Sequence, residues 1–235
     1  AGDHIDGSDI DMIAASWGHS FALRNDGTVI EWWPGDYDDH YSPLSPPQDG
    51  NVVAISGGVA HALALLNDGT VVGWGEDWGQ VTPPAGLTDV AAIAAGGYHS
   101  LALKSDGTVV GWGYDYDGQA TPPAGLTDVA AIAAGGYHSL ALKSDGTVVG
   151  WGYDCNGQVT PPAGLTDVAA IAAGDVHSLA LKSDGTVVGW GNNDEGQATP
   201  PAGLRAVAIA AGGYNSIALT ADGEVVQWGT WELPQ

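Results

Sequence analysis

One histidine in each of several repeated segments is the first feature of this sequence that could do chemistry. These histidines are His19, His61, His99, His138 and His177. Imidazole acts as a general base or a metal ligand, and a serine beside a base can become a nucleophile, as in the pair His99-Ser100. Adjacent residues of a strand point to opposite faces, however, and histidines in separate repeats are poorly placed to share one metal. We therefore expect a structural role for them, such as hydrogen bonding to a loop backbone.

No other set of residues forms a catalytic or metal-binding constellation. Residues 114–118 and 192–196 contain carboxylates before a glycine, but an EF-hand loop beginning at Asp115 would need a carboxylate where Leu126 stands. Cys155 has no predictable base beside it. We predict no catalytic residue, no metal site and no cofactor, and hence no enzyme. A weakly bound surface cation is the alternative.

A second set of residues varies between otherwise uniform repeats and has the composition of a recognition surface. Its members precede the histidine or follow a Trp-Gly pair. Because neighbouring strands run antiparallel, loops at these two places should lie at the same rim, where Trp and Tyr can act as anchors. The predicted binding face consists of Trp17, Trp78, Tyr98, Tyr114, Tyr116, Tyr137, Tyr153, Asp175, Asp194, Tyr214 and Trp231. The alternative is that these are ordinary solvated loops.

Internal repetition defines the elements that would position these residues. Residues 90–128 recur at 129–167 with three changes, and six Asp-Gly pairs mark six copies of about 39 residues. The units are residues 10–51, 52–89, 90–128, 129–167, 168–205 and 206–235, and the first carries an insertion at 33–51. We predict that they form one domain, residues 1–235.

Each unit has the pattern of short strands. Leu101 and Leu103 alternate with smaller or polar residues, and an Asp-Gly pair then leads into a second run, as in a tight hairpin whose residues tolerate positive φ. Residues 90–95 supply another strand. Residues 119–124 supply a weaker fourth one at the outer edge, because prolines cannot donate ladder hydrogen bonds. Six such four-stranded units predict an all-β fold, a six-bladed β-propeller, with a solenoid as the structural competitor.

The charge of the chain excludes several kinds of partner. It has 28 acidic and 5 basic residues, a formal net charge of -23. Nucleic-acid binding depends on Lys and Arg, so we predict no nucleic-acid partner and no binding to anionic membranes. No apolar run approaches the roughly 20 residues of a membrane helix. Such a surface suits a basic protein, a divalent cation or a salty medium.

Compartment and assembly state follow less directly from the sequence. The single cysteine excludes an intrachain disulfide. The chain begins with Ala rather than Met, which is compatible with the processing of a secreted precursor. We expect a secreted monomer.

The spaced motifs resemble the repeat of the regulator of chromosome condensation family. They are Ala-Gly-Gly-Tyr-His-Ser-Leu-Ala-Leu, Asp-Gly, Val-Val-Gly-Trp-Gly and Gly-Gln, and the resemblance covers about residues 10–228. The short repeats look closer to a bacterial branch that includes a secreted propeller inhibiting β-lactamases. The resemblance implies an extracellular bacterial interaction protein, and the acidic chain departs from the basic character that chromatin binding would require.

Propellers of that family usually have seven blades, whereas six units are countable here. We expect closure as six, through pairing of the segment before Ile13 with residues 231–234.

Three functions from different classes remain open. The first is a protein-binding propeller, inhibitor-like, whose aromatic and acidic face docks a basic protein. The second is a lectin-like carbohydrate-binding propeller in which Tyr98, Tyr137 and Tyr214 serve repeated equivalent sites. A structural or assembly role, suggested by the near-identical copies, is the third alternative.

Overall fold

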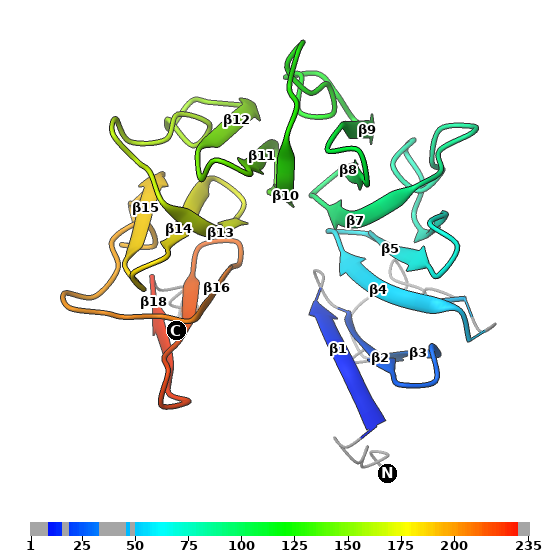
Figure 1. Ribbon diagram of the computed structural model, residues 1–235, viewed down its shortest axis with the longest axis horizontal. Coiled ribbons are helices and arrows are strands. Elements are labelled where there is room, and N and C mark those ends of the chain that lie inside the picture. The colour runs from blue at the N-terminus through cyan, green and yellow to red at the C-terminus, as the bar shows by residue number, and fades with distance from the viewer. Residues whose placement is uncertain (1–8, 16–18, 33–45, 48–49, 230–235) are drawn as a thin grey trace, which may run out of the picture.

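Six small antiparallel sheets make up the protein. The computed structural model describes residues 9–15, 19–32, 46–47 and 50–229, and these contain six three-stranded sheets and no helix. Figure 1 shows the sheets arranged as blades around a common axis, in chain order. The predicted all-β class and six-bladed propeller are confirmed. Within this part of the chain no helix could cross a membrane.

Each blade is one continuous stretch of chain, with its strands in sequence order from the axis outward. The inner strands are β1 (Ile10–Ala15), β4 (Val52–Gly57), β7 (Val90–Ala95), β10 (Val129–Ala134), β13 (Val168–Ala173) and β16 (Ala208–Ala211). The middle strands are β2 (Ser20–Arg24), β5 (His61–Leu66), β8 (His99–Lys104), β11 (His138–Lys143), β14 (His177–Lys182) and β17 (Ser216–Leu219). The outer strands are β3 (Val29–Trp32), β6 (Val71–Gly75), β9 (Val109–Gly113), β12 (Val148–Gly152), β15 (Val187–Gly191) and β18 (Val225–Trp228).

The Asp-Gly pairs form the hairpins between middle and outer strands, as predicted, but only the glycine has a positive φ. Gly107 adopts φ +81° and donates its N–H to the Lys104 carbonyl at 2.9 Å. The Asp106 carboxylate accepts hydrogen bonds from the backbone N–H of Thr108 at 3.0 Å and from its hydroxyl at 2.6 Å. The turn therefore resembles a type I turn with a glycine bulge rather than a primed turn.

The predicted fourth strand is wrong, although its position is right. Residues 119–124 form turns and bends rather than a ladder. They lie against the outer strand, because a Cβ on Gly111 would come within 2.2 Å of the Ala120 carbonyl oxygen. Two prolines remove the donors that a strand would need, so the segment covers the blade edge without pairing to it.

Neighbouring blades pack through large side chains on one face and small ones on the other. Leu101 and Leu103 of β8 pack against Ala141 and Trp151 of the next blade, whereas Ala102 faces the previous blade. Leu101 and Ala102 are both 0 % exposed. The middle strands β5, β8, β11 and β14 are thus buried on both faces, and burial of each leucine contributes about 1.5–3 kcal/mol.

Such clusters join every consecutive pair of blades, from the first to the sixth. Among the described residues none joins the sixth blade to the first, and β1 and β16 stand at the two ends of the arc (Figure 1). Ile13 of β1 is 77 % exposed, whereas its counterpart Ile55 in the second blade is 7 % exposed. The predicted closing partner, residues 231–234, lies outside the described residues.

A buried hydrogen-bond set, here called the blade clasp, crosses the junction between blades. The His99 Nε2 lies 2.8 Å from the Ser139 Oγ of the next blade. The Gln119 carbonyl accepts hydrogen bonds from the Ser139 hydroxyl at 2.8 Å and from the Trp151 indole N–H at 2.9 Å. Equivalent sets join blades two and three, four and five, and five and six.

The clasp serine gives a direct test of this architecture. We expect Ser139→Ala to lower the free energy of unfolding by about 1–3 kcal/mol, because His99 loses its buried acceptor. Ala62 occupies the equivalent position in the second blade, so alanine fits the space. The measurement is urea unfolding, with Ser144→Ala as control because the Ser144 hydroxyl is exposed and bonds only the Asp128 carbonyl. Equal losses for the two variants would contradict a special role of the clasp.

Candidate functional site

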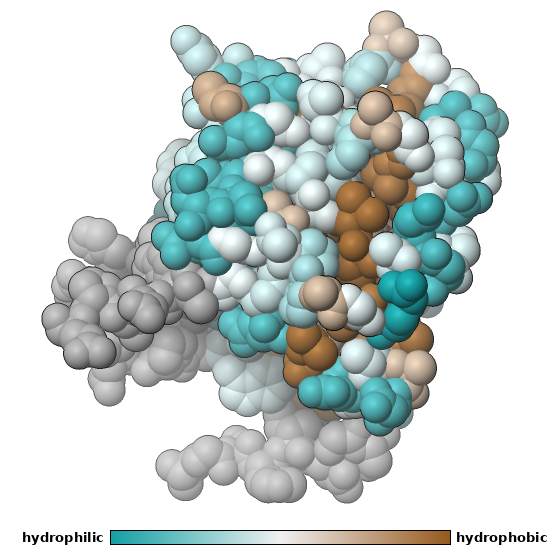
Figure 2. Space-filling view, turned by 90° about the vertical axis from the view of Figure 1, so that its left-hand side faces the viewer, coloured by the Kyte–Doolittle hydropathy of each residue, from teal (hydrophilic) through white to brown (hydrophobic). Residues whose placement is uncertain are grey.

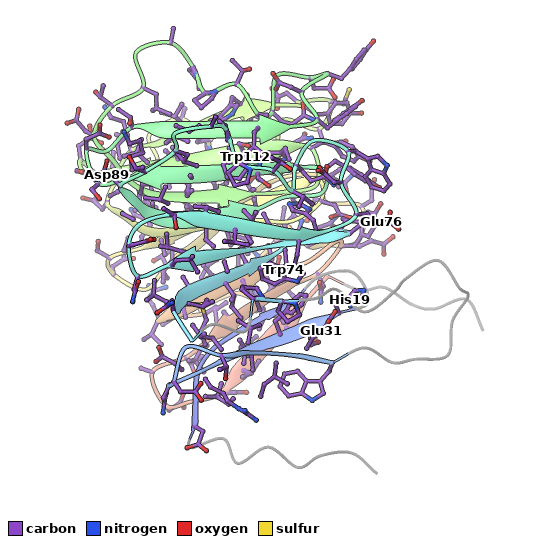
Figure 3. All side chains as sticks on the ribbon, turned by 90° about the vertical axis from the view of Figure 1, so that its right-hand side faces the viewer. His19, Glu31, Trp74, Glu76, Asp89 and Trp112 are labelled. Carbon is purple, nitrogen blue, oxygen red and sulfur yellow. The ribbon has the colours of Figure 1, made fainter. Side chains whose placement is uncertain are left out.

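The variable positions gather on one rim of the propeller. The Tyr114 N–H donates to the Tyr98 carbonyl at 2.9 Å, and the Tyr153 N–H to the Tyr137 carbonyl at 3.0 Å. The loop before each middle strand and the loop after each outer strand are therefore tied together. In Figure 3, Glu76 and His19 lie toward one rim and Asp89 toward the other. We call these the loop rim and the turn rim, the latter carrying the Asp-Gly hairpins.

Four aromatic side chains of the loop rim form a continuous row across three blades, here called the aromatic ladder. Ring centroids are 5.6 Å apart for Trp78 and Tyr98, 5.8 Å for Tyr98 and Tyr137, and 6.4 Å for Tyr137 and Tyr153. These separations and tilts are favourable for aromatic pairs. Trp78 is 59 % exposed and Tyr137 38 %, so the row is ordered yet accessible.

Other predicted members of the binding face lie on the same rim, outside the aromatic ladder. Tyr114, Tyr116, Tyr214 and Asp194 are exposed, Tyr116 most of all at 85 %. The Asp194 carboxylate accepts a hydrogen bond from the Asn192 side chain at 2.8 Å. Trp17 and Trp231, also predicted for this face, lie outside the described residues.

The hydrogen bonds between the two loops identify the residue of the second blade that corresponds to Tyr98. The Glu76 N–H donates to the Ala60 carbonyl, as the Tyr114 N–H does to that of Tyr98, so Ala60 is the counterpart. The aromatic row before the histidine therefore has no member in the second blade, and Trp78 from the other loop takes its place.

Asp115, one of the loop carboxylates considered for calcium, holds its own loop together. The Asp115 side chain accepts hydrogen bonds from the Ala120 N–H at 2.7 Å and the Thr121 hydroxyl at 2.5 Å. Asp154 does the same one blade later. Across the residues that the structure describes, no group of three or more His, Cys, Asp or Glu side chains could hold a metal ion.

Asp175 is a carboxylate of a different kind. It is half-buried on the loop rim, and burial raises the pKa of its carboxyl. None of the described residues donates a hydrogen bond to this side chain. Tyr137 lies close enough for the Asp175 charge to contribute, after burial and Tyr98, to the raised pKa of the Tyr137 phenol. Its negative charge is therefore partly desolvated and uncompensated.

Positive charge is segregated to the opposite rim. The five basic residues of the whole chain are Arg24, Lys104, Lys143, Lys182 and Arg205. Four of them end middle strands, next to the Asp-Gly turns, where Lys104 and Lys143 lie 3.9 Å from Asp106 and Asp145. The Arg205 side chain approaches Gly185 of another such turn. The loop rim thus carries carboxylates and no Lys or Arg.

The histidines pair with serines across blades, a contact that the sequence did not reveal. The Ser139 hydroxyl donates its proton to the Gln119 carbonyl, so its oxygen accepts the Nε2–H of His99. The imidazole is a donor here and not the base that would activate serine. Both side chains are 0 % exposed, so no substrate reaches them.

Burial also keeps these imidazoles neutral. Loss of water lowers the pKa of His61, His138 and His177 from 6.5 to about 4. Burial, followed by the two neighbouring histidines, lowers that of His99 to about 3. Their Nδ1 atoms are buried without a hydrogen-bond partner. The histidines hold blades together rather than exchange protons at neutral pH.

Sequence comparison identifies the repeat. The family described as regulator of chromosome condensation (RCC1) repeat matches residues 52–77, 90–119, 129–158 and 168–197. The chain belongs to the RCC1-repeat family. The clasp residues His99, Ser139 and Trp151 and the Gly118-Gln119 pair fall within these RCC1 repeats. No curated protein sequence is similar enough to match.

Solved RCC1-like propellers share the fold at low sequence identity. The ectodomain of the Physcomitrella patens receptor kinase CR4 superimposes with a TM-score of 0.78 at 24% identity, over 96% of this chain and 65% of that one. Saccharomyces cerevisiae Prp20p gives 0.75 at 22%, over 94% and 72%. Human WBSCR16 gives 0.75 at 22%, over 94% and 77%. This chain therefore spans about two thirds of the length of the CR4 ectodomain.

The buried histidines predict acid lability of this RCC1-repeat protein. Their folded pKa values lie below the unfolded value, so below about pH 6.5 the unfolded chain binds protons that the folded chain does not. Stability should be complete above that pH and fall on acidification toward pH 4, by about 1.4 kcal/mol per histidine and pH unit.

Unfolding at several pH values, with NMR titration of the imidazole C2 protons, measures this effect. His99→Asn, which copies Asn215 of the last blade, should flatten the dependence. Imidazoles that titrate near pH 6.5 in the folded protein would contradict the assignment.

The raised pKa of Asp175 predicts the opposite dependence of stability on pH. Its folded pKa is raised, so its contribution favours the folded state at low pH and is lost as the pH rises through the folded pKa. We expect Asp175→Asn to raise the melting temperature at pH 7, and this gain to shrink in acid. Differential scanning calorimetry of Asp175→Asn and of the exposed control Asp194→Asn makes the comparison. A lower melting temperature for Asp175→Asn would show that the carboxylate is compensated.

Proposed function

We propose that this protein is a non-catalytic binding propeller that docks a basic protein surface on its loop rim. The observation that carries the proposal is the aromatic ladder, exposed on a rim with carboxylates and no Lys or Arg. Aromatic side chains supply binding energy at low entropic cost, and acidic surroundings speed and select the approach of a basic partner.

The ladder suits this role because its rings are already ordered in the free protein. Each ring contacts a neighbour, and loops carrying them are tied by backbone hydrogen bonds. Little side-chain freedom remains to be lost on binding, which preserves affinity. The loop rim is thus a prearranged surface.

The fold supports binding as the class of function. Prp20p is described together with its binding to Gsp1p and histones, and another structure shows yeast RCC1 bound to Kap60. At 22% identity these proteins share only the fold with this chain, so the partner has to be sought from the chemistry of the rim.

Binding to purified basic and acidic proteins of matched size, at low and high salt, tests the proposal. We expect saturable binding of a basic protein that weakens as salt rises, because rim charges are screened. Tyr98→Ala with Tyr137→Ala should weaken binding at least about tenfold, as for interface anchors. Tyr116→Ala, outside the ladder, should change it less than about twofold.

The melting temperature of each variant is the control for folding. Unchanged binding by the ladder variant would refute the proposed surface. A glycan array tests the second candidate function, carbohydrate binding. Saturable sugar binding at several equivalent sites, lost on Tyr98→Ala and independent of salt, would replace protein docking by a lectin function.

A further inference from the structure

Asp175 interrupts a row of glycines at the innermost place of the loop rim. In register with it stand Gly97, Gly136 and Gly213. This position links consecutive blades by backbone hydrogen bonds: the Gly136 N–H donates to the Gly174 carbonyl at 3.1 Å and the Asp175 N–H to the Gly213 carbonyl at 3.4 Å. The Asp175 side chain projects beside the next blade. The three glycines of the row have no side chain to place there.

The glycines on both sides leave the carboxylate unobstructed. The three atoms nearest to a Cβ on Gly136 would be the carbonyl oxygen, Cα and Cβ of Asp175, at 2.9–3.3 Å. A Cβ on Gly213 would lie 3.2 Å from the Asp175 Oδ2 and would meet nothing but that carboxylate. In the next position of the same blade Val176 replaces the tyrosine of its neighbours. The Oδ2 of the carboxylate therefore lies next to Gly213 of the following blade. Its charge also contributes to the raised pKa of Tyr137, a ring of the aromatic ladder.

We propose that Asp175 receives one cationic side chain, Lys or Arg, of the protein partner, and that the adjacent rings of the aromatic ladder hold its aliphatic stem. The inference rests on the proposed function and adds the identity of the anchoring group. A carboxylate that is partly removed from water, without an internal donor, gains most from an incoming cation that both pairs with it and donates hydrogen bonds. Tyrosine faces attract the same cation.

Other ligands fit the position less well. A divalent metal needs several oxygen ligands, and Asp175 belongs to no group of three or more His, Cys, Asp or Glu side chains among the described residues. A sugar hydroxyl would supply hydrogen bonds but no countercharge. The nearest positive charges of the chain are confined to the turn rim, so the counter-ion must come from another molecule.

NMR titration with small probes tests the proposal without knowledge of the partner. The probes are Nα-acetyl-lysine methylamide, its arginine counterpart and, as the uncharged control, the Nε-acetylated lysine compound. We expect saturable shifts of the Tyr137 ring and the Asp175 amide with the charged probes alone. Asp175→Asn and Asp175→Gly, the latter introducing the glycine found at this position in the third, fourth and sixth blades, should raise the dissociation constant at least about tenfold. Asp106→Asn, which removes an exposed carboxylate on the turn rim, should leave it within about twofold.

The outcomes separate this inference from the proposed function. Absence of saturable shifts with wild-type protein, or equal affinity for Asp175→Asn, overturns the cation-receiving role. If Asp175→Asn also binds the basic protein normally while the ladder variant does not, the loop rim docks its partner without this anchor. If neither variant loses the basic protein, the proposed function fails as well.

Discussion

At each junction that has a blade clasp, one peptide carbonyl accepts the hydrogen bonds that join the two blades. The Gln119 carbonyl accepts two hydrogen bonds from the next blade, one from the Trp151 indole and one from the Ser139 hydroxyl, which in turn accepts the N–H of His99. All these groups are buried, and the hydrogen bonds among them replace the hydrogen bonds to water that each group loses on folding. The arrangement demands a close approach at the axis. A Cβ on Gly135 would lie 2.3 Å from the Gly174 carbonyl oxygen, which is why glycine stands there.

The clasp also explains where the molecule can vary. Tyr98 directly precedes the clasp histidine, and the loop that begins at Tyr114 ends at the clasp residue Gln119, whose side-chain oxygen accepts the Asp117 N–H. The variable residues are therefore fixed at both ends by groups that cannot change without loss of the junction. Substitutions in these loops alter the chemistry of the rim while the underlying geometry is retained. Function in such a scaffold depends on loop side chains held by a rigid support.

The sequence predicted the repeat architecture because spacing and hairpin chemistry are local. It failed where distant residues meet. The pair His99-Ser100 could be judged only within one strand, whereas the real partner of His99 is Ser139, 40 positions away. Residues 119–124 had strand-like spacing, but their prolines leave too few donors for a ladder. The sequence predicted that both sets of loops share one rim, because that follows from antiparallel strand order alone. It could not predict the aromatic ladder, because the ladder depends on distances between side chains of different blades. Nothing in the sequence distinguished the unpaired Asp175 from Asp115, which stabilises its own loop.

The first blade shows how much of the clasp is replaceable. Its junction with the second blade has Ala62 in place of serine, and the buried Trp74 indole nitrogen has no hydrogen-bond partner among the described residues. Phe21 instead meets Trp74 edge-to-face with ring centroids 5.8 Å apart. Apolar contact thus substitutes for the polar set at one junction, at the cost of an unsatisfied donor.

The distribution of rim residues argues for asymmetric recognition. Repeated sugar sites would need the same residues in each blade, but only the third and fourth blades carry tyrosine in both loops, Tyr98 with Tyr114 and Tyr137 with Tyr153. The fifth blade has Asp175-Val176 in place of Gly-Tyr. Strands of these blades are nearly identical, so the differences are concentrated where solvent meets the rim. A surface that breaks its own symmetry in this way is suited to one large, irregular partner rather than to many copies of a small one.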